Sequence, residues 1–364
     1  MIPVPVYWNK RTQNCSPYVP GEQPKDRAFI KLNTNENPYP PSPKVIAAIQ
    51  EAACDTLRLY PDPLCTEFRE AAAKQYGVKA EQVFPGNGSD EVLAFVFGAF
   101  FESAAAGESA PLLFPDITYS FYPVYARLWD IPCKTIPLAA DFSINAEDYL
   151  VPSGGVIFPN PNAPTGTALS LSQIRMILDW QKKADRVVVI DEAYAAFGAD
   201  SVVPLLGDYP NLLTVHTLSK SASLAGLRTG FAIGSAGLIE GLFRIRDSFN
   251  SYTMDRLALA GARAAVEDAA YYDKVNKKIA ATRERVSAEL LALGFEVIPS
   301  RANFVFIRRR GISGSDLFAR LRRHGILVRH FNSGRTADYL RVSIGTNQDM
   351  DAFLDVCKKT GEQK

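Results

Sequence analysis

The sequence predicts an α/β protein in which a mostly parallel seven-stranded sheet is flanked by helices and followed by a smaller α+β domain. Seven short apolar segments recur between residues 82 and 233, and helical patterns lie between most of them. Segments such as 187–190 are apolar at every position, as expected for strands buried on both faces of a parallel sheet. After about residue 250 a long charged helical stretch precedes further short strands. This order of elements favours two domains of different character.

The positions of the elements follow from runs of apolar residues and from helical periodicity. The predicted strands of the larger domain are residues 82–84, 112–114, 134–137, 155–158, 186–190, 213–216 and 231–233, and its predicted helices include 43–54, 64–76, 90–101 and 170–183. The smaller domain is predicted to contain helical stretches at 254–293 and 314–324 and strands at 295–299, 304–308, 326–329 and 340–344. Residues 1–40 are rich in Pro and Asn and predict an extended arm rather than a packed element. The chain therefore divides into this arm (1–40), a larger domain (41–250) and a smaller domain (251–364).

The composition excludes several classes of function. The 364 residues carry a formal net charge of +1, so no long-range field would attract nucleic acid or an anionic membrane. The longest apolar run, 92–101, has ten residues, which is about half of what a transmembrane helix needs. The five cysteines are scattered and odd in number, which fits reduced thiols in the cytoplasm, and the three histidines are too few and badly spaced for a His-based metal site. We expect a cytoplasmic protein that acts on small molecules.

The first informative junction lies where the predicted strand at 82–84 meets the helix at 90–101. Gly88, Ser89 and Asp90 stand at this junction. Glycine lets the backbone approach a ligand closely, and the free N–H groups of a helix start favour an anion such as phosphate. The same residues also suit a simple helix start with Ser89 as the N-cap, so this junction alone identifies no site.

The second junction follows the predicted strand at 186–190. Asp191 comes directly after this buried strand, where a carboxylate is costly unless it meets a cation such as a protonated pyridine nitrogen. Tyr194 could donate a hydrogen bond to a phenolate oxygen on the same ring. The alternative is an aspartate at the sheet edge that caps the next turn.

The third junction follows the predicted strand at 213–216. Burial and cationic neighbours would lower the pKa of Lys220 and leave a free amine able to form a Schiff base with an aldehyde. Ser219 and Arg228 flank it and suit a phosphate, since one offers a hydroxyl and the other a permanent cation. A lone surface lysine is the alternative, and this spacing disfavours it.

A loop rich in proline and asparagine follows the predicted strand at 155–158. Its composition predicts a rigid turn. The amide of Asn162 could bond the oxygen of a cofactor ring, or the loop could be a plain turn.

Taken in order, these segments resemble the fold-type I pyridoxal-phosphate enzymes of the aspartate aminotransferase superfamily, and most nearly the histidinol-phosphate aminotransferase family. The resemblance covers nearly the whole chain; each motif is modest, but the ordered set is specific. The matching segments are Ser-Pro-Tyr18, Leu-Asn-Thr-Asn35-Glu-Asn-Pro, Tyr60-Pro-Asp-Pro, Gly-Asn-Gly88-Ser89-Asp90-Glu, Thr-Tyr119, Pro-Asn-Ala-Pro-Thr-Gly, Asp191-Glu-Ala-Tyr194, Leu-Ser219-Lys220, Ala-Gly-Leu-Arg228 and Leu-Arg341-Val-Ser-Ile-Gly.

The resemblance implies that the cofactor is pyridoxal 5′-phosphate. Lys220 would hold it as a Schiff base and transfer protons, Asp191 would keep the ring nitrogen protonated, and Tyr194 would bond the phenolic oxygen. Tyr119 would stack on the ring. The remaining implied cofactor contacts are Gly88, Ser89, Asp90, Asn162, Ser219 and Arg228, with Tyr60 reaching the phosphate from the partner subunit of a homodimer.

The resemblance also implies the substrate side of the site. Tyr18 and Asn35 would line the entrance, to which the N-terminal arm leads from the smaller domain. Arg341 would clamp a substrate carboxylate, or would have a different task with an amino-alcohol substrate, and Arg329 would contact a substrate phosphate. One position departs from the family pattern: Ala163 stands where an asparagine usually precedes Pro-Thr-Gly. Asn162 would then take over the ring-oxygen contact, or Tyr194 would make it alone.

The implied reaction is ping-pong transamination between histidinol phosphate and 2-oxoglutarate. Aromatic amino acids as substrates and the decarboxylation of threonine phosphate on the same scaffold are the alternatives. A non-catalytic nucleotide- or cofactor-binding protein is a different class of function. A dinucleotide-binding protein would need G-x-G-x-x-G after the first strand, which this sequence lacks.

Overall fold

A computed structural model describes residues 7–24, 27–107, 110–332 and 334–359. Its larger sheet has seven strands in the order β2–β8–β7–β6–β5–β3–β4. The strands are β2 (Val83–Gly86), β3 (Leu112–Pro115), β4 (Cys133–Ile136), β5 (Gly155–Pro159), β6 (Val188–Asp191), β7 (Leu212–Thr217) and β8 (Gly230–Gly234). Strand β8 runs antiparallel to both of its neighbours, β2 and β7, and the other pairs of this sheet are parallel. The seven predicted strands and the mostly parallel sheet are confirmed.

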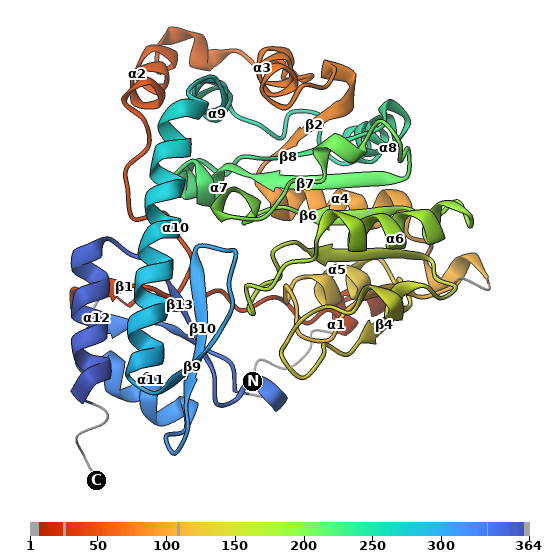
Figure 1. Cartoon of the computed structure of the whole chain (residues 1–364). Helices are drawn as coiled ribbons and strands as arrows, with labels where there is room; N and C mark the ends of the chain where they lie inside the picture. The colour runs from red at the N-terminus through yellow and green to blue at the C-terminus, as the bar shows by residue number, and fades with distance from the viewer. Residues whose placement is uncertain (1–6, 25–26, 108–109, 333, 360–364) are drawn as a thin grey trace.

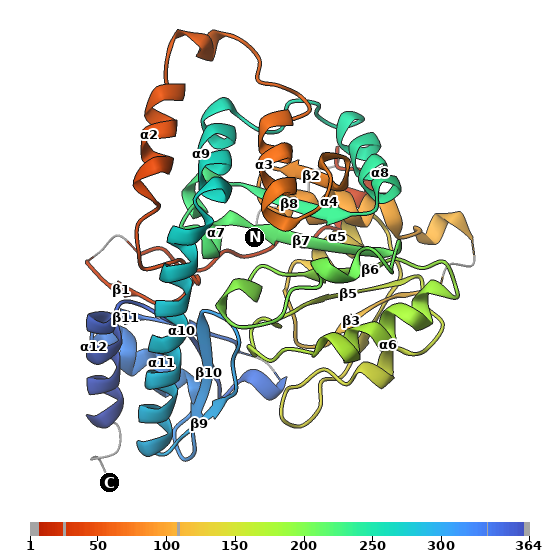
Figure 2. The same cartoon turned by 45° about the horizontal axis from the view of Figure 1, so that its top comes forward.

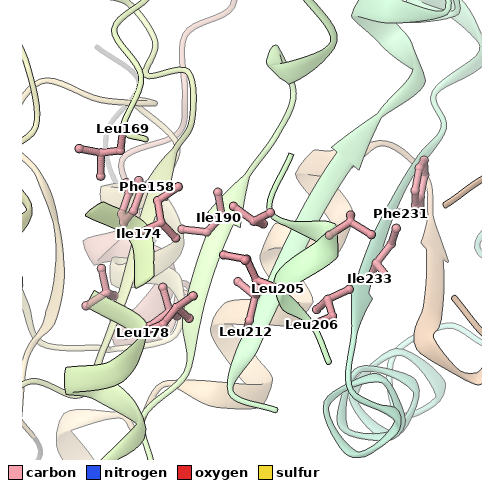
Figure 3. Packing of buried hydrophobic residues seen from close by; sticks show 14 of the residues in the cluster. Phe158, Leu169, Ile174, Leu178, Ile190, Leu205, Leu206, Leu212, Phe231 and Ile233 are labelled. Carbon is pink, nitrogen blue, oxygen red and sulfur yellow. The ribbon is translucent and has the colours of Figure 1, made fainter. Parts of the chain in front are cut away.

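The strands of the larger sheet are buried on both faces, and their side chains alternate between two hydrophobic cores. Phe158 of β5 and Ile190 of β6 belong to one core, whereas Ile157 and Val189 belong to the other. Figure 3 shows part of the first core, in which side chains of β5 to β8 lie close to Ile174 and Leu178 of α6 (Leu171–Lys182). The alternation explains why these segments are apolar at every position, because each of their residues faces one core or the other.

Helices cover both faces of this sheet (Figure 1). One core includes residues of α2 (Pro43–Ala52), α3 (Thr66–Tyr76), α6 (Leu171–Lys182) and α9 (Arg256–Glu267). The other core includes residues of α4 (Ser89–Phe100), α5 (Tyr122–Leu128) and α8 (Ala236–Asp247). The four helices predicted in the larger domain are α2, α3, α4 and α6.

The smaller domain is built on an antiparallel sheet in the order β12–β13–β10–β9. Its strands are β9 (Phe295–Ile298), β10 (Phe304–Arg309), β12 (Arg329–His330) and β13 (Leu340–Ser343), and its helices are α10 (Ala269–Ala292), α11 (Gly314–Arg323) and α12 (Asn347–Lys359). The helical stretch predicted at 254–293 is two helices, because the chain leaves helical geometry at Asp268 between α9 and α10. Helix α10 runs from beside α9 to the smaller sheet in both views (Figures 1 and 2). The predicted domain boundary at residue 250 stays a prediction.

The N-terminal segment is more structured than the sequence predicts. A short helix, α1 (Lys10–Asn14), is capped by the side chain of Asn9. Strand β1 (Ile30–Lys31) pairs in parallel with β11 (Ile326–Leu327), and Leu32 is buried in the core of the smaller domain. The prediction of an unpacked arm is wrong for this part, because its apolar residues pack despite the surrounding Pro and Asn. Residues 1–6 and 25–26 of the predicted arm lie outside the described residues.

The predicted strand at 326–329 also divides, since β11 pairs with β1 while β12 pairs with β13. Among the described residues, no helix combines the length and the apolar character that a bilayer crossing requires. Short 3₁₀ helices complete the chain: η1 (Asp55–Arg58), η2 (Ala80–Gln82), η3 (Ala104–Ala106), η4 (Ala146–Tyr149), η5 (Ala195–Phe197), η6 (Val203–Leu205), η7 (Ala225–Leu227) and η8 (Gly334–Thr336).

Candidate active site

A cavity of about 540 Å³ lies where strands β6 and β7 end, as expected for a ligand site in an open α/β sheet. Helix α7 (Leu218–Ser221) follows β7 at this point (Figure 2). The predicted site residues that line the cavity are Tyr18, Asn35, Ser89, Asp90, Tyr119, Asp191, Tyr194, Ser219, Lys220, Arg228, Arg329 and Arg341. The structure therefore brings most of the predicted site together, from the N-terminal segment, the larger sheet and the smaller sheet.

Lys220 presents its amine to this cavity from the short helix α7. Its Nζ donates a hydrogen bond to the backbone oxygen of Thr34 over 2.9 Å, and its backbone oxygen accepts one from Asn37. Burial, together with the nearby Arg341 cation, lowers the pKa of Lys220 to about 8. A lysine with such a pKa has an appreciable neutral fraction near pH 7 and can act as a nucleophile or a base.

Asp191 ends β6 as a buried carboxylate. Its Oδ1 accepts a hydrogen bond from the backbone N–H of Ala193 over 3.1 Å, and its Oδ2 accepts one from the hydroxyl of Tyr122 over 3.3 Å. Burial raises its pKa to about 6. Within the described ranges it has no ion-pair partner, so a cation that entered the cavity would find a carboxylate without a competing partner.

The helix start at residues 88–90 forms one wall of the cavity. Gly88, with φ +86°, is the N-cap of α4, and no side chain caps this helix; the interpretation of Ser89 as the cap is wrong. A Cβ at Gly88 would lie 2.6 Å from the guanidinium of Arg228, and the φ of +86° strains any other residue here, so this position favours glycine. Uncapped backbone N–H groups and an adjacent guanidinium together favour an anion.

In this arrangement Arg228 is paired with a carboxylate. Its Nη2 donates to Oδ2 of Asp90 over 3.2 Å, and the hydroxyl of Tyr119 donates to Oδ1 of the same carboxylate over 2.6 Å. Because nearly half of the Arg228 side chain is exposed, it remains accessible to an anion in the cavity.

Tyr194 and the proline-rich loop lie on another side of the cavity. The Tyr194 hydroxyl accepts a hydrogen bond from Nδ2 of Asn35 over 3.0 Å, and burial raises its pKa, so it is protonated at neutral pH. Ala163 lines the cavity, whereas Asn162 does not. The Asn162 amide donates to Ile117 and Thr165 and accepts from Thr118. These contacts fit the alternative in which Asn162 only shapes the loop.

The far side of the cavity carries two arginines and aromatic rings. Arg341 is partly buried; it donates from Nη2 to the backbone oxygen of Asn33, while its buried Nε has no hydrogen-bond partner in the described part of the chain. The guanidinium of Arg329 lies 5.9 Å from the ring centre of Phe331, and Tyr18 stacks on Phe121 with ring centres 4.3 Å apart. A buried N–H without an acceptor favours an incoming oxyanion. This side of the cavity therefore suits an anionic substrate.

Tyr60 is a predicted site residue that lies outside the cavity lining. It is 78% exposed and stacks on Tyr252 with ring centres 4.6 Å apart. Within one chain it therefore makes no contact with the site.

Comparison with known proteins identifies the family. The family model of aminotransferase class I and II matches residues 27–356. A histidinol-phosphate aminotransferase of Clostridium acetobutylicum is 55% identical over 353 residues, which are 97% of this chain and 98% of that protein. Histidinol-phosphate aminotransferase 1 of Bordetella parapertussis is also 55% identical, over 97% of this chain and 98% of that protein. The chain belongs to the class I and II aminotransferases.

Solved structures of similar proteins agree with this family assignment. The histidinol-phosphate aminotransferase of Sinorhizobium meliloti in complex with pyridoxal-5′-phosphate has a TM-score of 0.86 at 25% identity, over 99% of this chain and 98% of that one. The histidinol-phosphate aminotransferase of Clostridium acetobutylicum shares the fold with a TM-score of 0.83 at 23% identity, over 92% of this chain and 99% of that one. The fold-type I architecture that the resemblance implied is confirmed.

Several groups that contact the site of this aminotransferase were not predicted from the sequence. The backbone oxygen of Thr34 and the hydroxyl of Tyr122 bond Lys220 and Asp191 respectively, and Phe121 stacks on Tyr18. Every residue has a backbone carbonyl, so residue types do not indicate which carbonyl contacts the site. Tyr122 stands three residues after Tyr119 at the start of a helix, and this helical spacing was the available signal.

Proposed function

We propose that this aminotransferase binds pyridoxal 5′-phosphate on Lys220 and transfers the amino group of histidinol phosphate to 2-oxoglutarate in a ping-pong reaction. The observation that carries the proposal is that a lysine with a lowered pKa, a buried carboxylate without a cation and an accessible guanidinium all line one cavity. The names of the two relatives at 55% identity support the choice of amino donor.

The cavity residues fit this cofactor. Asp191 would pair with the ring nitrogen and keep it protonated, and Tyr194 would bond the phenolic oxygen. Ser89, Ser219 and Arg228, with the backbone at Gly88 and Asp90, would hold the phosphate, and Tyr119 would lie against the ring. The bound cofactor supplies an electron sink for the bond that breaks at the substrate carbon.

The chain itself supplies the proton transfer and the orientation. Nζ of Lys220, with a pKa of about 8, would take a proton from the substrate carbon that bears the amine and would return it to the former aldehyde carbon of the cofactor, on the other side of the amine nitrogen. Arg341 and Arg329 bind the oxyanions of the substrate, and the rings of Tyr18 and Phe121 stand beside its planar part. Fixing the substrate in this way orients the breaking bond and contributes to the rate.

The exposed apolar residues support a homodimer. Ile46, Leu57 and Leu64 are at least 44% exposed, and Tyr60 joins this segment to Tyr252 through ring stacking. Exposed apolar groups gathered in this way favour a protein interface. In the dimer, Tyr60 reaches the phosphate of the partner subunit. The enzyme works in the cytoplasm, where the free thiols of all five cysteines would stay reduced.

The test is a comparison of three amino donors with the purified enzyme and added cofactor: histidinol phosphate, phenylalanine and threonine phosphate. The proposal expects glutamate formation from 2-oxoglutarate to be fastest with histidinol phosphate. A preference for phenylalanine would identify an aromatic aminotransferase instead. Release of carbon dioxide from threonine phosphate would refute transamination. Analytical ultracentrifugation of the same sample tests the dimer, and a monomer at assay concentration would contradict it.

A further inference from the structure

Tyr194 has a hydrogen-bond partner far away in the sequence. Nδ2 of Asn35 donates to its hydroxyl oxygen over 3.0 Å, across 159 positions of the chain. Asn35 is 1% exposed and has φ +55°, a left-handed conformation that asparagine adopts more readily than most residues. The contact is therefore buried and depends on a residue type suited to this backbone.

The direction of the Asn35 amide is determined by Ser343. The backbone N–H of Asn35 donates to Oγ of Ser343 over 2.9 Å. The same Oγ donates its proton to Oδ1 of Asn35 over 2.9 Å. Oδ1 is thus the end that faces Ser343, and Nδ2 is the end that faces Tyr194. The backbone oxygen of Asn35 also accepts a bond from Nδ2 of Asn303 over 3.0 Å.

An amide N–H can only donate, so the hydroxyl oxygen of Tyr194 accepts and its own proton points elsewhere. Over the described ranges, no protein group accepts that proton. Tyr194 and Asn35 both line the cavity. The facing loop offers no substitute donor, because Ala163 has an apolar side chain and the amide of Asn162 is engaged within the loop.

We propose that Asn35 is a positioning residue: its amide turns the hydroxyl proton of Tyr194 into the cavity, towards the phenolic oxygen of the cofactor. This inference rests on the proposed function. Ser343 ends β13 and Asn303 precedes β10, so the smaller sheet holds the amide that orients a tyrosine of the larger domain. Asn35 therefore acts through Tyr194, and both ends of its amide are already engaged by protein groups.

The consequence is measurable on the bound cofactor. A donor to its phenolic oxygen favours the deprotonated form and so lowers the pKa at which the visible absorption band changes. Without the Asn35 amide, the Tyr194 proton is no longer directed at that oxygen. The pKa of the visible band should then rise by roughly 0.5–1 unit, the size expected for one weakened hydrogen bond.

The experiment is a pH titration of the visible band in the holoenzyme and in two variants. Asn35→Gly keeps the left-handed backbone and its hydrogen bonds but removes the amide. Asn35→Asp keeps the shape and replaces the donor with an acceptor. Both should raise the pKa of the band, and Ser343→Ala, which frees the amide, should raise it by less. Asp130→Gly is the matched control, because Asp130 also has φ +55° but lies outside the cavity lining.

The experiment distinguishes failure of the positioning role of Asn35 from failure of the proposed function. If the wild-type holoenzyme and both Asn35 variants titrate at the same pH, the positioning role is overturned while the cofactor assignment stands. If the wild-type protein with added cofactor develops no visible band, the proposed function and this inference are both overturned. Thermal unfolding of each variant checks that it folds; a shift that appears equally in Asp130→Gly would reflect general destabilisation and would contradict the proposal.

Discussion

At the strand ends of the larger sheet, Asp191 and Lys220 face the cavity with ionisable side chains. The segment at 33–37 contributes differently: the backbone oxygens of Asn33 and Thr34 accept hydrogen bonds from Arg341 and Lys220. The first region therefore supplies the groups that change charge, and the second holds them in position. The difference teaches that chemistry and geometry in this site come from different parts of the chain, and the pairing of β1 with β11 attaches the second part to the smaller domain.

The largest effect is expected at the strand ends. Asp191→Asn keeps the shape of the side chain but removes the negative charge that would hold a protonated ring nitrogen. We expect kcat to fall by about 10²–10³-fold, as for the loss of a strong preorganised electrostatic contact. Steady-state kinetics with saturating cofactor measures this, and a variant within threefold of wild type would remove Asp191 from the mechanism.

The pH dependence of cofactor attachment tests Lys220. Only the neutral amine attacks an aldehyde, and burial lowers the pKa of Lys220 to about 8. The rate of attachment to the apoenzyme should level off above pH 8 and fall about tenfold per pH unit below it. Stopped-flow absorbance measures the rate. An attachment rate that keeps rising to pH 10 would indicate an ordinary exposed lysine. It would contradict the view that the strand ends supply a lysine with a lowered pKa.

The packing of the N-terminal segment is tested by Leu32→Ala. Leu32 is 2% exposed in the core of the smaller domain. Its truncation should lower the free energy of unfolding by about 2–4 kcal/mol, as for other buried leucines. Denaturant unfolding is the measurement, and Val19→Ala, at a position 75% exposed, is the matched control with an expected change within about 0.5 kcal/mol. Equal effects of the two changes would show that the segment does not pack as described.

The smallest effect is expected for Tyr122→Phe. The change removes one 3.3 Å hydrogen bond to Asp191 and leaves the backbone contact from Ala193 in place. We expect kcat to fall less than about tenfold, because this hydrogen bond is long and the carboxylate keeps its charge and its contact with Ala193. A loss as large as that of Asp191→Asn would mean that Tyr122 has a direct role in the reaction.

The same contrast explains what could be predicted from the sequence. Strands such as β6 are apolar on both faces, so their pattern identifies them, and a charged residue at their end is conspicuous. Asp191, Lys220 and Arg228 could therefore be found without a structure. Strand β1 has only two residues, and its apolar neighbour Leu32 is surrounded by Pro and Asn, so an extended arm was expected instead.

Contacts made by backbone atoms could not be predicted either. The bond from Lys220 to Thr34 and the direction of the Asn35 amide depend on how the smaller sheet packs against the segment at 33–37. Asn162 and Ala163 show that the direction of a side chain in a loop could not be predicted either. The sequence left open whether Asn162 would bond the cofactor or only shape the loop, and the geometry of the loop assigns the cavity to Ala163 and the turn to Asn162.

The most direct test of the central claim is to find which amine holds the cofactor. The holoenzyme would be reduced with borohydride, which fixes a cofactor joined to an amine as a stable adduct, then digested and examined by mass spectrometry. We expect the added mass on the peptide that contains Lys220, and no adduct in Lys220→Ala. An adduct on another lysine, or none in the wild-type protein, would contradict the account.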